Sequence, residues 1–395
     1  YEIASCLVGS EMCIRDSEAI IIGGNHHNGL GLARILGING VKVHAVVVDE
    51  CKDSFLRKSK YIYSCIVFRN IDVALDYIKQ SYANRQNYVV IPYSDVAAHG
   101  LDNRLNEFEG YHIPSIGQQQ GLIAKLMQKN EQCEFAKKNG IKMAKTWVCS
   151  LKDEIDIPQD IVIPCIVKPV ISSEGNKKDI RVCRTLDQLG KCLYSYKTFG
   201  YCRALVQEYL KIDYEIDVFG CTLKQSPYIC LIPTKTIRSW PPEGGTNSFS
   251  QIITNQTIVD KCRAIIEKLE KSGFYGLYDI ELFVVGDEVL LNEINYRNSG
   301  DVYMGIQQEY YYPYAWFLDC IGEKVDIGSN PHGDSYAMTE FADFRNVLKK
   351  RVKLLEWVDD FGKTKDFALF FKGDMRPAFD RSIYYIKQFF CGKKM

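Results

Sequence analysis

The chain has 395 residues, more than one compact core accommodates, so we expect two or three domains. Its 49 basic and 49 acidic residues cancel, which argues against the basic face that a nucleic-acid partner requires. No stretch approaches the roughly 18 consecutive apolar residues of a membrane span. The 15 cysteines are scattered without a Cys-x-x-Cys pair, which argues against zinc and favours a reducing, cytoplasmic location.

Strands and helices alternate in the first part of the chain. Residues 1–17 lack the features of a signal peptide and resemble translated adapter sequence, so we expect a non-native leader there. The following apolar and periodic runs predict a doubly wound parallel sheet over residues 18–120. Its predicted strands are residues 19–22, 41–48 and 88–91, and its predicted helices are residues 29–37 and 71–82.

The middle of the chain mixes helices with strands that suit antiparallel sheets. We predict an α+β region over residues 121–325 and a C-terminal extension over residues 326–395 that the sequence leaves unassigned. The predicted helices are residues 122–138, 186–199 and 258–272. The predicted strands are residues 146–149, 161–168, 180–183, 204–207 and 214–219.

Two apolar segments near residue 290 carry acids. Residues 278–285 and 289–295 predict a hairpin with a three-residue loop, and this register places Glu281 directly opposite Glu293. Like charges so placed destabilise a hairpin, so we expect a cation between them. Glu281, Glu293 and Asn295 offer the oxygen ligands that suit magnesium bound with phosphates. The alternative is the solvated face of an antiparallel sheet.

Cationic side chains stand near the ends of predicted elements. A nucleotide triphosphate needs several of them because its charge increases during phosphoryl transfer. Each alone is more often a surface charge, but Lys168 ends an apolar strand, and this puts its ammonium beside a core. The polar loop at residues 170–179 could offer donors to phosphate, or be an ordinary surface loop. The cations are Lys129, Lys168, Lys235, Arg238 and Arg297.

Polar residues also follow several predicted strands. Residues 207–210 leave a strand and Glu215 comes soon after, an arrangement that can hold a purine and ribose or be a plain edge strand. Small substrates bind beyond the carboxyl ends of parallel strands, although turn formation explains the same residues slightly better. Those residues are Asn25, Asn28, Ser94 and Asp95; His26 and His27 are expected to be loop residues.

Taken in order, these features resemble the ATP-grasp superfamily, which includes biotin carboxylase, carbamoyl-phosphate synthase and D-alanine ligase. The Glu-x-Asn-x-Arg run at residues 293–297 is similar to the biotin carboxylase motif, and residues 22–34 are similar to D-aspartate ligase and related carboxylate–amine ligases. The resemblance covers residues 18–325. It implies a doubly wound domain followed by a two-lobed ATP-grasp module.

The resemblance also implies roles for single residues. Nucleotide contacts would come from Lys129 and Lys168 at the phosphates, Gln207, Glu208, Tyr209 and Leu210 at adenine, Glu215 at ribose and, less securely, Lys235. Glu281, Glu293 and Asn295 would hold Mg²⁺, with Mn²⁺ as a substitute, and Arg297 and Lys168 would be catalytic.

The implied reaction is ATP-dependent ligation of a small carboxylate to an amine. The carboxylate attacks the γ-phosphate, and the acyl-phosphate then meets the amine to give an amide, ADP and phosphate. Arg297 is followed by Asn298-Ser299-Gly300-Asp301 rather than the Val-Glu of biotin carboxylase, which disfavours biotin carboxylation. The alternatives are carboxyl phosphorylation of the carbamoyl-phosphate synthase kind and a non-catalytic nucleotide-binding protein. A two-fold dimer would be ordinary at this size.

Overall fold

The structure is a computed structural model, and it describes residues 18–82, 88–152, 154–155, 157–170, 179–224, 230–242, 245–325 and 335–390. The chain divides into two compact units. Unit 1 comprises Tyr1–Ile123, Val218–Asp279 and Tyr296–Met395, and unit 2 comprises Ala124–Asp217 and Ile280–Asn295. Among the described residues, no helix is both long enough and apolar enough to cross a membrane.

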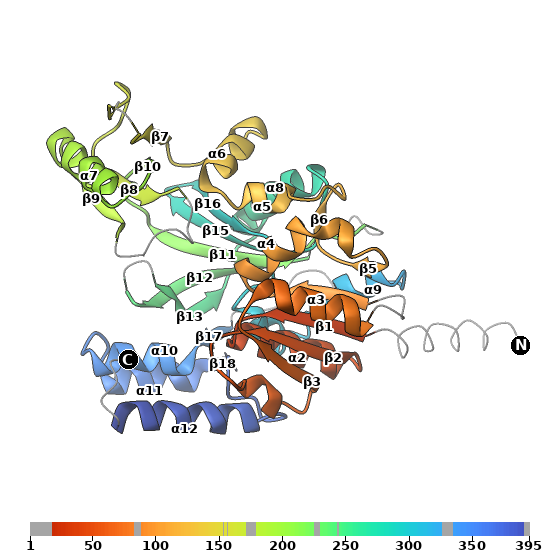
Figure 1. Cartoon of the computed structure of the whole chain (residues 1–395). Coiled ribbons are helices and arrows are strands. Elements are labelled where there is room, and N and C mark those ends of the chain that lie inside the picture. Colours follow the sequence, from red (N-terminus) through yellow and green to blue (C-terminus); the bar gives the residue numbers. More distant parts are fainter. Residues whose placement is uncertain are drawn as a thin grey trace, which may run out of the picture. The chain divides into compact units, whose positions relative to one another are not determined.

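Unit 1 begins with a five-stranded sheet in the order β3-β2-β1-β4-β5, and its printed pairings are all parallel (Figure 1). The predicted doubly wound domain is therefore confirmed. Its strands are β1 (Glu18–Gly23), β2 (Lys42–Val48), β3 (Ile62–Phe68), β4 (Tyr88–Pro92) and β5 (Tyr111–His112). Its helices are α2 (His27–Ile38), α3 (Ile71–Tyr82), α4 (Asp95–Asn103) and the short η1 (Phe55–Lys58) and η2 (Leu105–Glu107).

Strand β1 shows why this sheet is doubly wound, because its side chains alternate between two cores. Ala19 and Ile21 pack in the core that includes α2, whereas Ile20 and Ile22 pack in the core that includes α3 and α4. All four are fully buried. A short apolar run with both faces covered is what a central parallel strand requires.

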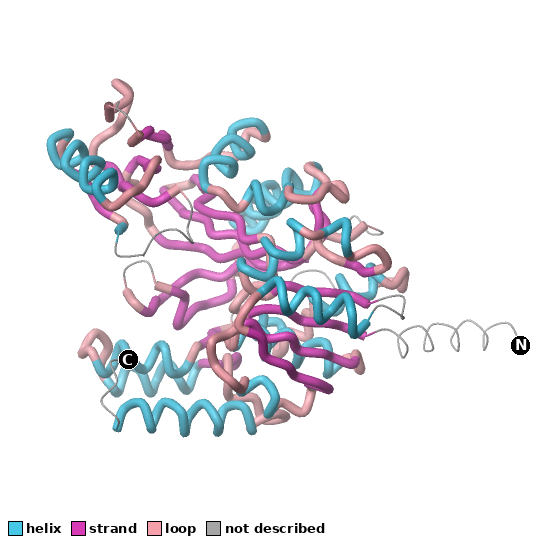
Figure 2. The backbone as a smooth tube through the Cα atoms, in the orientation of Figure 1, coloured by secondary structure: helices cyan, strands magenta, loops and turns pink. Residues whose placement is uncertain are grey.

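The rest of unit 1 is built around antiparallel strands and the C-terminal residues. Its strands are β6 (Ser115–Ile116), β12 (Cys230–Trp240), β13 (Thr246–Ile252), β14 (Phe274–Tyr275), β17 (Tyr336–Met338) and β18 (Thr364–Phe367). Its helices are α8 (Gln256–Lys271), η4 (Val302–Gly305), α9 (Tyr312–Cys320), α10 (Glu340–Leu348), α11 (Leu354–Lys363) and α12 (Arg376–Phe390). The C-terminal region that the sequence left unassigned is therefore mainly helical in its described part (Figure 2).

A fully buried arginine joins this C-terminal region to the parallel sheet. Arg34 of α2 donates to the backbone oxygens of Ala368, Leu369 and Asp374 at 3.1, 2.9 and 2.9 Å. Its Nε also lies 3.2 Å from Oδ2 of Asp374. A buried guanidinium requires such a complete set of acceptors, so the buried Ala368, Leu369 and Asp374 belong to the interior of unit 1.

Unit 2 contains a four-stranded sheet in the order β7-β10-β8-β9, whose printed pairings are antiparallel. Helix α7 packs on it through Leu189, Leu193 and Tyr196. The strands are β7 (Thr146–Ser150), β8 (Cys165–Pro169), β9 (Arg181–Cys183) and β10 (Arg203–Glu208). The helices are α6 (Lys129–Lys138) and α7 (Leu186–Thr198), and α5 (Leu122–Leu126) precedes them. The single helix predicted over residues 122–138 is therefore two.

A seven-stranded sheet has the order β16-β15-β11-β12-β13-β17-β18. Two of its strands, β11 (Tyr214–Cys221) and β15 (Leu277–Val285), begin in one unit and end in the other. The predicted hairpin consists of β15 and β16 (Glu288–Asn295), but its loop is wrong. The turn has two residues, Gly286 and Asp287, and Gly286 has a φ of 56°. Positive φ at the first central residue is typical of the tightest hairpin turns, and glycine adopts it without strain.

Candidate functional site: a lysine–carboxylate cluster in unit 2

Lys168 lies at the end of β8, where it faces a glutamine of the neighbouring strand. Its Nζ donates to Oε1 of Gln207 at 2.9 Å, and Nε2 of Gln207 lies 3.2 Å from Oγ1 of Thr146 on β7. Gln207 is buried, so this row of three strands fixes the direction of the lysine. Gln207 was predicted at adenine; the contact that the structure gives it is with Lys168.

Helix α6 is fixed to the hairpin by a glutamine that the sequence gave no reason to select. Gln132 donates from Nε2 to the backbone oxygen of Ile294 at 2.7 Å and accepts from the backbone N–H of Ile294 at 2.9 Å. Lys129 lies one turn earlier on the same face of α6. Its Nζ lies 3.4 Å from Oε2 of Glu293, whereas the sequence predicted a cation between Glu281 and Glu293.

The two-residue turn changes which residue lies beside Glu281. Oε2 of Glu281 accepts a hydrogen bond from Nδ2 of Asn292 at 3.0 Å, so the predicted direct opposition of Glu281 and Glu293 is wrong. The alternation of buried and half-buried residues along β16 is interrupted, because Asn292 and Glu293 are both half-buried between Leu291 and Ile294.

Both acids act on Lys168. Burial and the neighbouring Lys129 lower the pKa of Lys168 to about 8, and Glu293 and Glu281 oppose this decrease. Lysine with so low a pKa remains largely charged near neutrality but is poorly compensated. An additional anion at this position would therefore be stabilised, and this is the property that a phosphate site needs.

The predicted adenine and ribose residues lie in the same unit. Backbone N–H groups of Glu208 and Tyr209 donate to the backbone oxygens of Lys145 and Pro164 at 2.8 and 3.0 Å, and Leu210 follows them, half-buried. Burial raises the pKa of Glu215, and the nearby Lys168 ammonium partly offsets this. The polar loop predicted at residues 170–179 lies outside the described residues at positions 171–178.

The carboxylates suit a divalent cation that takes some of its ligands from the protein and the others from a nucleotide. Glu281 and Glu293 supply hard oxygens, and Asn295 ends β16 as a buried residue two positions beyond Glu293. Within the described residues, no group of three or more His, Cys, Asp and Glu side chains is arranged to hold a metal ion. Magnesium is commonly held by one or two carboxylates with its other ligands from phosphates and water, so this donor set suits it.

Arg297 belongs to unit 1 and is surrounded by carboxylates there. Its Nη1 donates to Oδ2 of Asp279, and its Nε donates to Oδ1 of Asp95 at 3.1 Å. Burial lowers the pKa of Arg297, but the two carboxylates reverse this and raise it above its ordinary value. Burial and the nearby Asp279 raise the pKa of Asp301 to about 7, while the side-chain amide of Asn247 donates to it at 3.1 Å.

The remaining predicted cations are in unit 1 as well. Lys235 is exposed on β12 and lies opposite Gln251 of β13. Arg238 donates to both carboxylate oxygens of Asp343 at 3.0 and 2.8 Å and to Oδ2 of Asp360 at 2.6 Å. Arg238 therefore anchors α10 and α11 to β12.

The polar residues at the ends of the first strands stabilise loops and helix termini. Ser94 accepts from the backbone N–H of Ala97 and caps α4, and the ring of His26 accepts from Asn28 at the start of α2. Oδ1 of Asn25 accepts from Ser54 at 2.7 Å. Turn and cap roles account for these contacts.

Comparisons with known proteins bear on the domain and the fold of the chain. Residues 134–308 match the ATP-grasp domain model. The formate-dependent phosphoribosylglycinamide formyltransferase of Methanocaldococcus jannaschii is 30% identical over 185 residues, which cover 44% of this chain and 45% of the relative. The chain thus spans about half the length of this curated relative.

Solved structures share the fold at low identity. The N5-carboxyaminoimidazole synthetase of Staphylococcus aureus has a TM-score of 0.63 at 17% identity and covers 84% of this chain and 85% of its own. The L-amino acid ligase of Bacillus licheniformis has a TM-score of 0.60 at 12% identity, and the match covers 81% of this chain and 80% of the ligase. Residues 134–308 therefore match the ATP-grasp domain, as the resemblance in the sequence predicted, and the chain shares its fold with these solved structures.

Proposed function

We propose that the protein is an ATP-dependent ligase that joins a small carboxylate to an amine through an acyl-phosphate. The observation that carries the proposal is the cluster in unit 2, where Lys129 pairs with Glu293 and the under-compensated Lys168 lies near both Glu281 and Glu293. Lysines beside carboxylates suit a site for phosphates and a divalent cation together. The named relatives and the amino acid ligase fold support the carbon–nitrogen bond.

Each residue has a distinct task in this proposal. Lys129 and Lys168 neutralise the phosphates, and Gln207 holds Lys168 in direction. Glu281, Glu293 and Asn295 would hold magnesium, which when bound supplies charge neutralisation for the transferred phosphate. The backbone at residues 208–210 borders adenine and Glu215 the ribose.

Arg297 and Lys235 carry weaker parts of the proposal. The guanidinium of Arg297 is already held by Asp279 and Asp95, so it would act on an acyl-phosphate as part of a group of fixed charges. Lys235 would be a peripheral nucleotide contact. We also propose a cytoplasmic location and a two-fold dimer with small-molecule substrates, from the cysteine pattern and the size of the chain.

Two other functions use the same cluster. The first is carboxyl phosphorylation of the carbamoyl-phosphate synthase kind. Such an enzyme would form an acyl-phosphate, but no amino acid of a test panel would accept the acyl group. A non-catalytic nucleotide-binding protein would bind ADP without turnover, but the complete set of lysines and carboxylates favours catalysis.

The experiment is ADP release with hydroxylamine trapping across a panel of carboxylic and amino acids, with magnesium. Carboxylate-dependent ADP release with hydroxamate formation is expected, and amines should replace hydroxylamine to give an amide. Glu293→Gln should abolish the turnover with the fold intact. Tight ADP binding without any hydroxamate would refute the ligase and leave the binding protein.

A further inference from the structure

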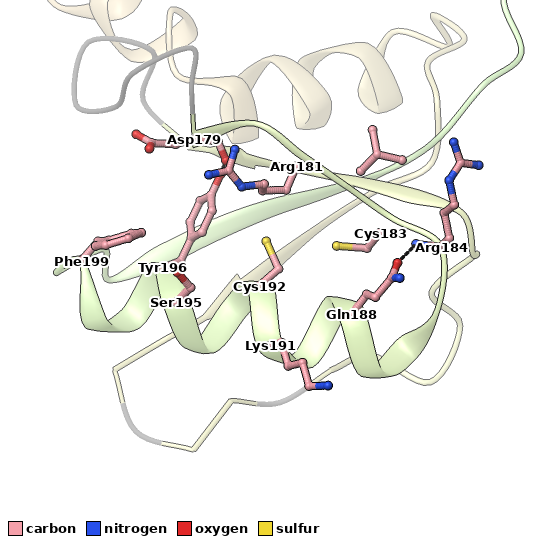
Figure 3. Close-up of a pocket in the computed structure, with 11 residues that line it drawn as sticks. Asp179, Arg181, Cys183, Arg184, Gln188, Lys191, Cys192, Ser195, Tyr196 and Phe199 are labelled. Carbon is pink, nitrogen blue, oxygen red and sulfur yellow. Dashed lines mark hydrogen bonds between the residues drawn. The ribbon is translucent and has the colours of Figure 1, made fainter.

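A cavity lies in unit 2 between the edge strand β9 and helix α7 (Figure 3). Its volume is about 440 Å³, within the range of small-molecule sites. It is lined by Asp179, Arg181, Val182, Cys183, Arg184, Gln188, Lys191, Cys192, Ser195, Tyr196 and Phe199. None of these is a residue of the lysine–carboxylate cluster, so the cavity requires its own explanation.

The floor of the cavity is uncharged. Cys183 and Tyr196 are buried, and Cys192 is half-buried beside them. Burial raises the pKa of the Cys192 thiol to about 12 and raises that of Cys183, so both stay protonated. Protonated thiols and an aromatic ring form a soft apolar surface, which suits the hydrocarbon part of a ligand.

The rim of the cavity carries positive charge. Figure 3 shows Arg181 and Arg184 on opposite sides of the two thiols, and Lys191 of α7 also lines the cavity. Lys191 is paired with Asp187 at 2.7 Å, and the carboxylate of Asp179 accepts from the hydroxyl of Tyr201 at 2.8 Å. Among the described residues, the guanidinium of Arg184 has no carboxylate partner within ion-pair distance. An anion is therefore the complementary charge.

The surroundings of the cavity are unusually apolar for a surface. Val182 and Phe199 line it with 43% and 69% of their areas exposed, and the adjacent Ile180, Leu186 and Tyr194 are exposed as well. A single exposed apolar residue needs no explanation, but a concentration of them over residues 180–199 marks a contact surface.

We propose that this cavity binds a small amphipathic organic anion, a carboxylate or sulfonate on an aromatic or short aliphatic body. The anionic group contacts Arg181 or Arg184, and the apolar body covers the thiols and Tyr196. Because the cavity shares no residue with the lysine–carboxylate cluster, it is a separate binding site in unit 2, and it does not depend on the proposed ligase reaction.

The test uses 8-anilinonaphthalene-1-sulfonate as the probe, with the full chain and fluorescence titration. We expect one saturable site from which octanoate displaces the probe, and weaker binding of the uncharged N-phenyl-1-naphthylamine. The double variant Arg181→Glu/Arg184→Glu should weaken probe binding by about tenfold or more, since a charge-assisted contact is lost. Lys142→Glu is the matched control, because it reverses an exposed charge of the same unit that does not line the cavity.

A second variant tests the cavity itself. Ser195→Trp should fill the space and prevent probe binding while circular dichroism and ADP binding stay as in the wild type. Probe binding that survives both Ser195→Trp and the double arginine variant would overturn the proposal. Failure of octanoate to displace the probe would equally overturn it. Loss of ligase activity alone has no bearing on this site, since ADP binding and probe binding are measured independently.

Discussion

The cations of the two units are held in opposite ways. In unit 1, Arg34, Arg238 and Arg297 each have carboxylates or several carbonyl groups around the guanidinium. In unit 2, Lys129 and Lys168 share two half-buried carboxylates, and burial with mutual repulsion lowers the pKa of Lys168. Compensated arginines hold the fold together, whereas under-compensated lysines leave electrostatic attraction for a ligand.

The arginine side of this comparison gives the largest expected effect. Arg238→Met leaves the buried Asp343 without its partner, and breaking a buried ion pair costs about 3–5 kcal/mol of unfolding free energy. Urea unfolding measures this loss of unfolding free energy. Lys235→Met, on the same strand, is the control. An unchanged midpoint, or a weakened ADP affinity in the folded variant, would contradict the structural role of Arg238.

The lysine side predicts the reverse pattern. Lys168→Met should lower kcat/KM for ATP by about 10²–10³-fold, because a preorganised charge at the phosphates is lost. Its stability should not decrease, because a poorly compensated buried charge is removed. Lys142→Met, an exposed lysine paired with Glu288, is the matched control. Normal kinetics in Lys168→Met would remove the basis of the proposed site.

Buried acids of unit 1 predict a pH dependence of stability. Burial raises the pKa values of Asp301, Glu340 and Asp366 to about 7, so the folded state binds their protons more tightly than the unfolded chain. Their contribution is complete below about pH 4 and is lost as the pH rises through 7, with a slope of about 1.4 kcal/mol per pH unit and group in between.

Thermal unfolding between pH 5 and 8 tests this slope. The melting temperature should fall as the pH rises, and Asp301→Asn should make the fall shallower. Asp187→Asn, a substitution of an exposed carboxylate, should leave the slope as it is. An identical slope in Asp301→Asn and the wild type would show that Asp301 does not titrate in this range.

Gln207 gives the smallest expected effect and separates orientation from chemistry. Gln207→Leu removes the acceptor of Lys168 but keeps the ammonium, so the KM for ATP should rise by about five- to tenfold, the value of one hydrogen bond. Gln207→Glu should bring the KM for ATP most of the way back to the wild-type value, because an acceptor oxygen is present. If both variants lose kcat instead of affinity, Gln207 contacts the reacting groups directly.

The sequence predicted the elements whose signals are local. The alternation around β1 and the lysine at the end of β8 can be read from a few neighbouring residues, and the structure has both. The hairpin acids were also found, but the loop length was wrong because two- and three-residue turns share the same glycine signal.

Other parts of the site have no local signal. Gln132 is an ordinary helical glutamine until Ile294, 162 residues later, is brought to it. Arg238 has its partners Asp343 and Asp360 at separations of 105 and 122 residues, so the sequence placed it with the phosphates. Long-range pairs of this kind depend on the complete fold, and a single sequence gives no means of ranking them.

The acceptors of Arg34 have a consequence for synthesis of the protein. This arginine leaves the ribosome with α2, but the carbonyl and carboxylate groups that surround it lie 334 to 340 residues later. During translation the nascent first domain therefore has a charge on its core face with nothing to receive it. Completion of that domain therefore awaits synthesis of Asp374, and a chain truncated before residue 368 lacks every one of these acceptors.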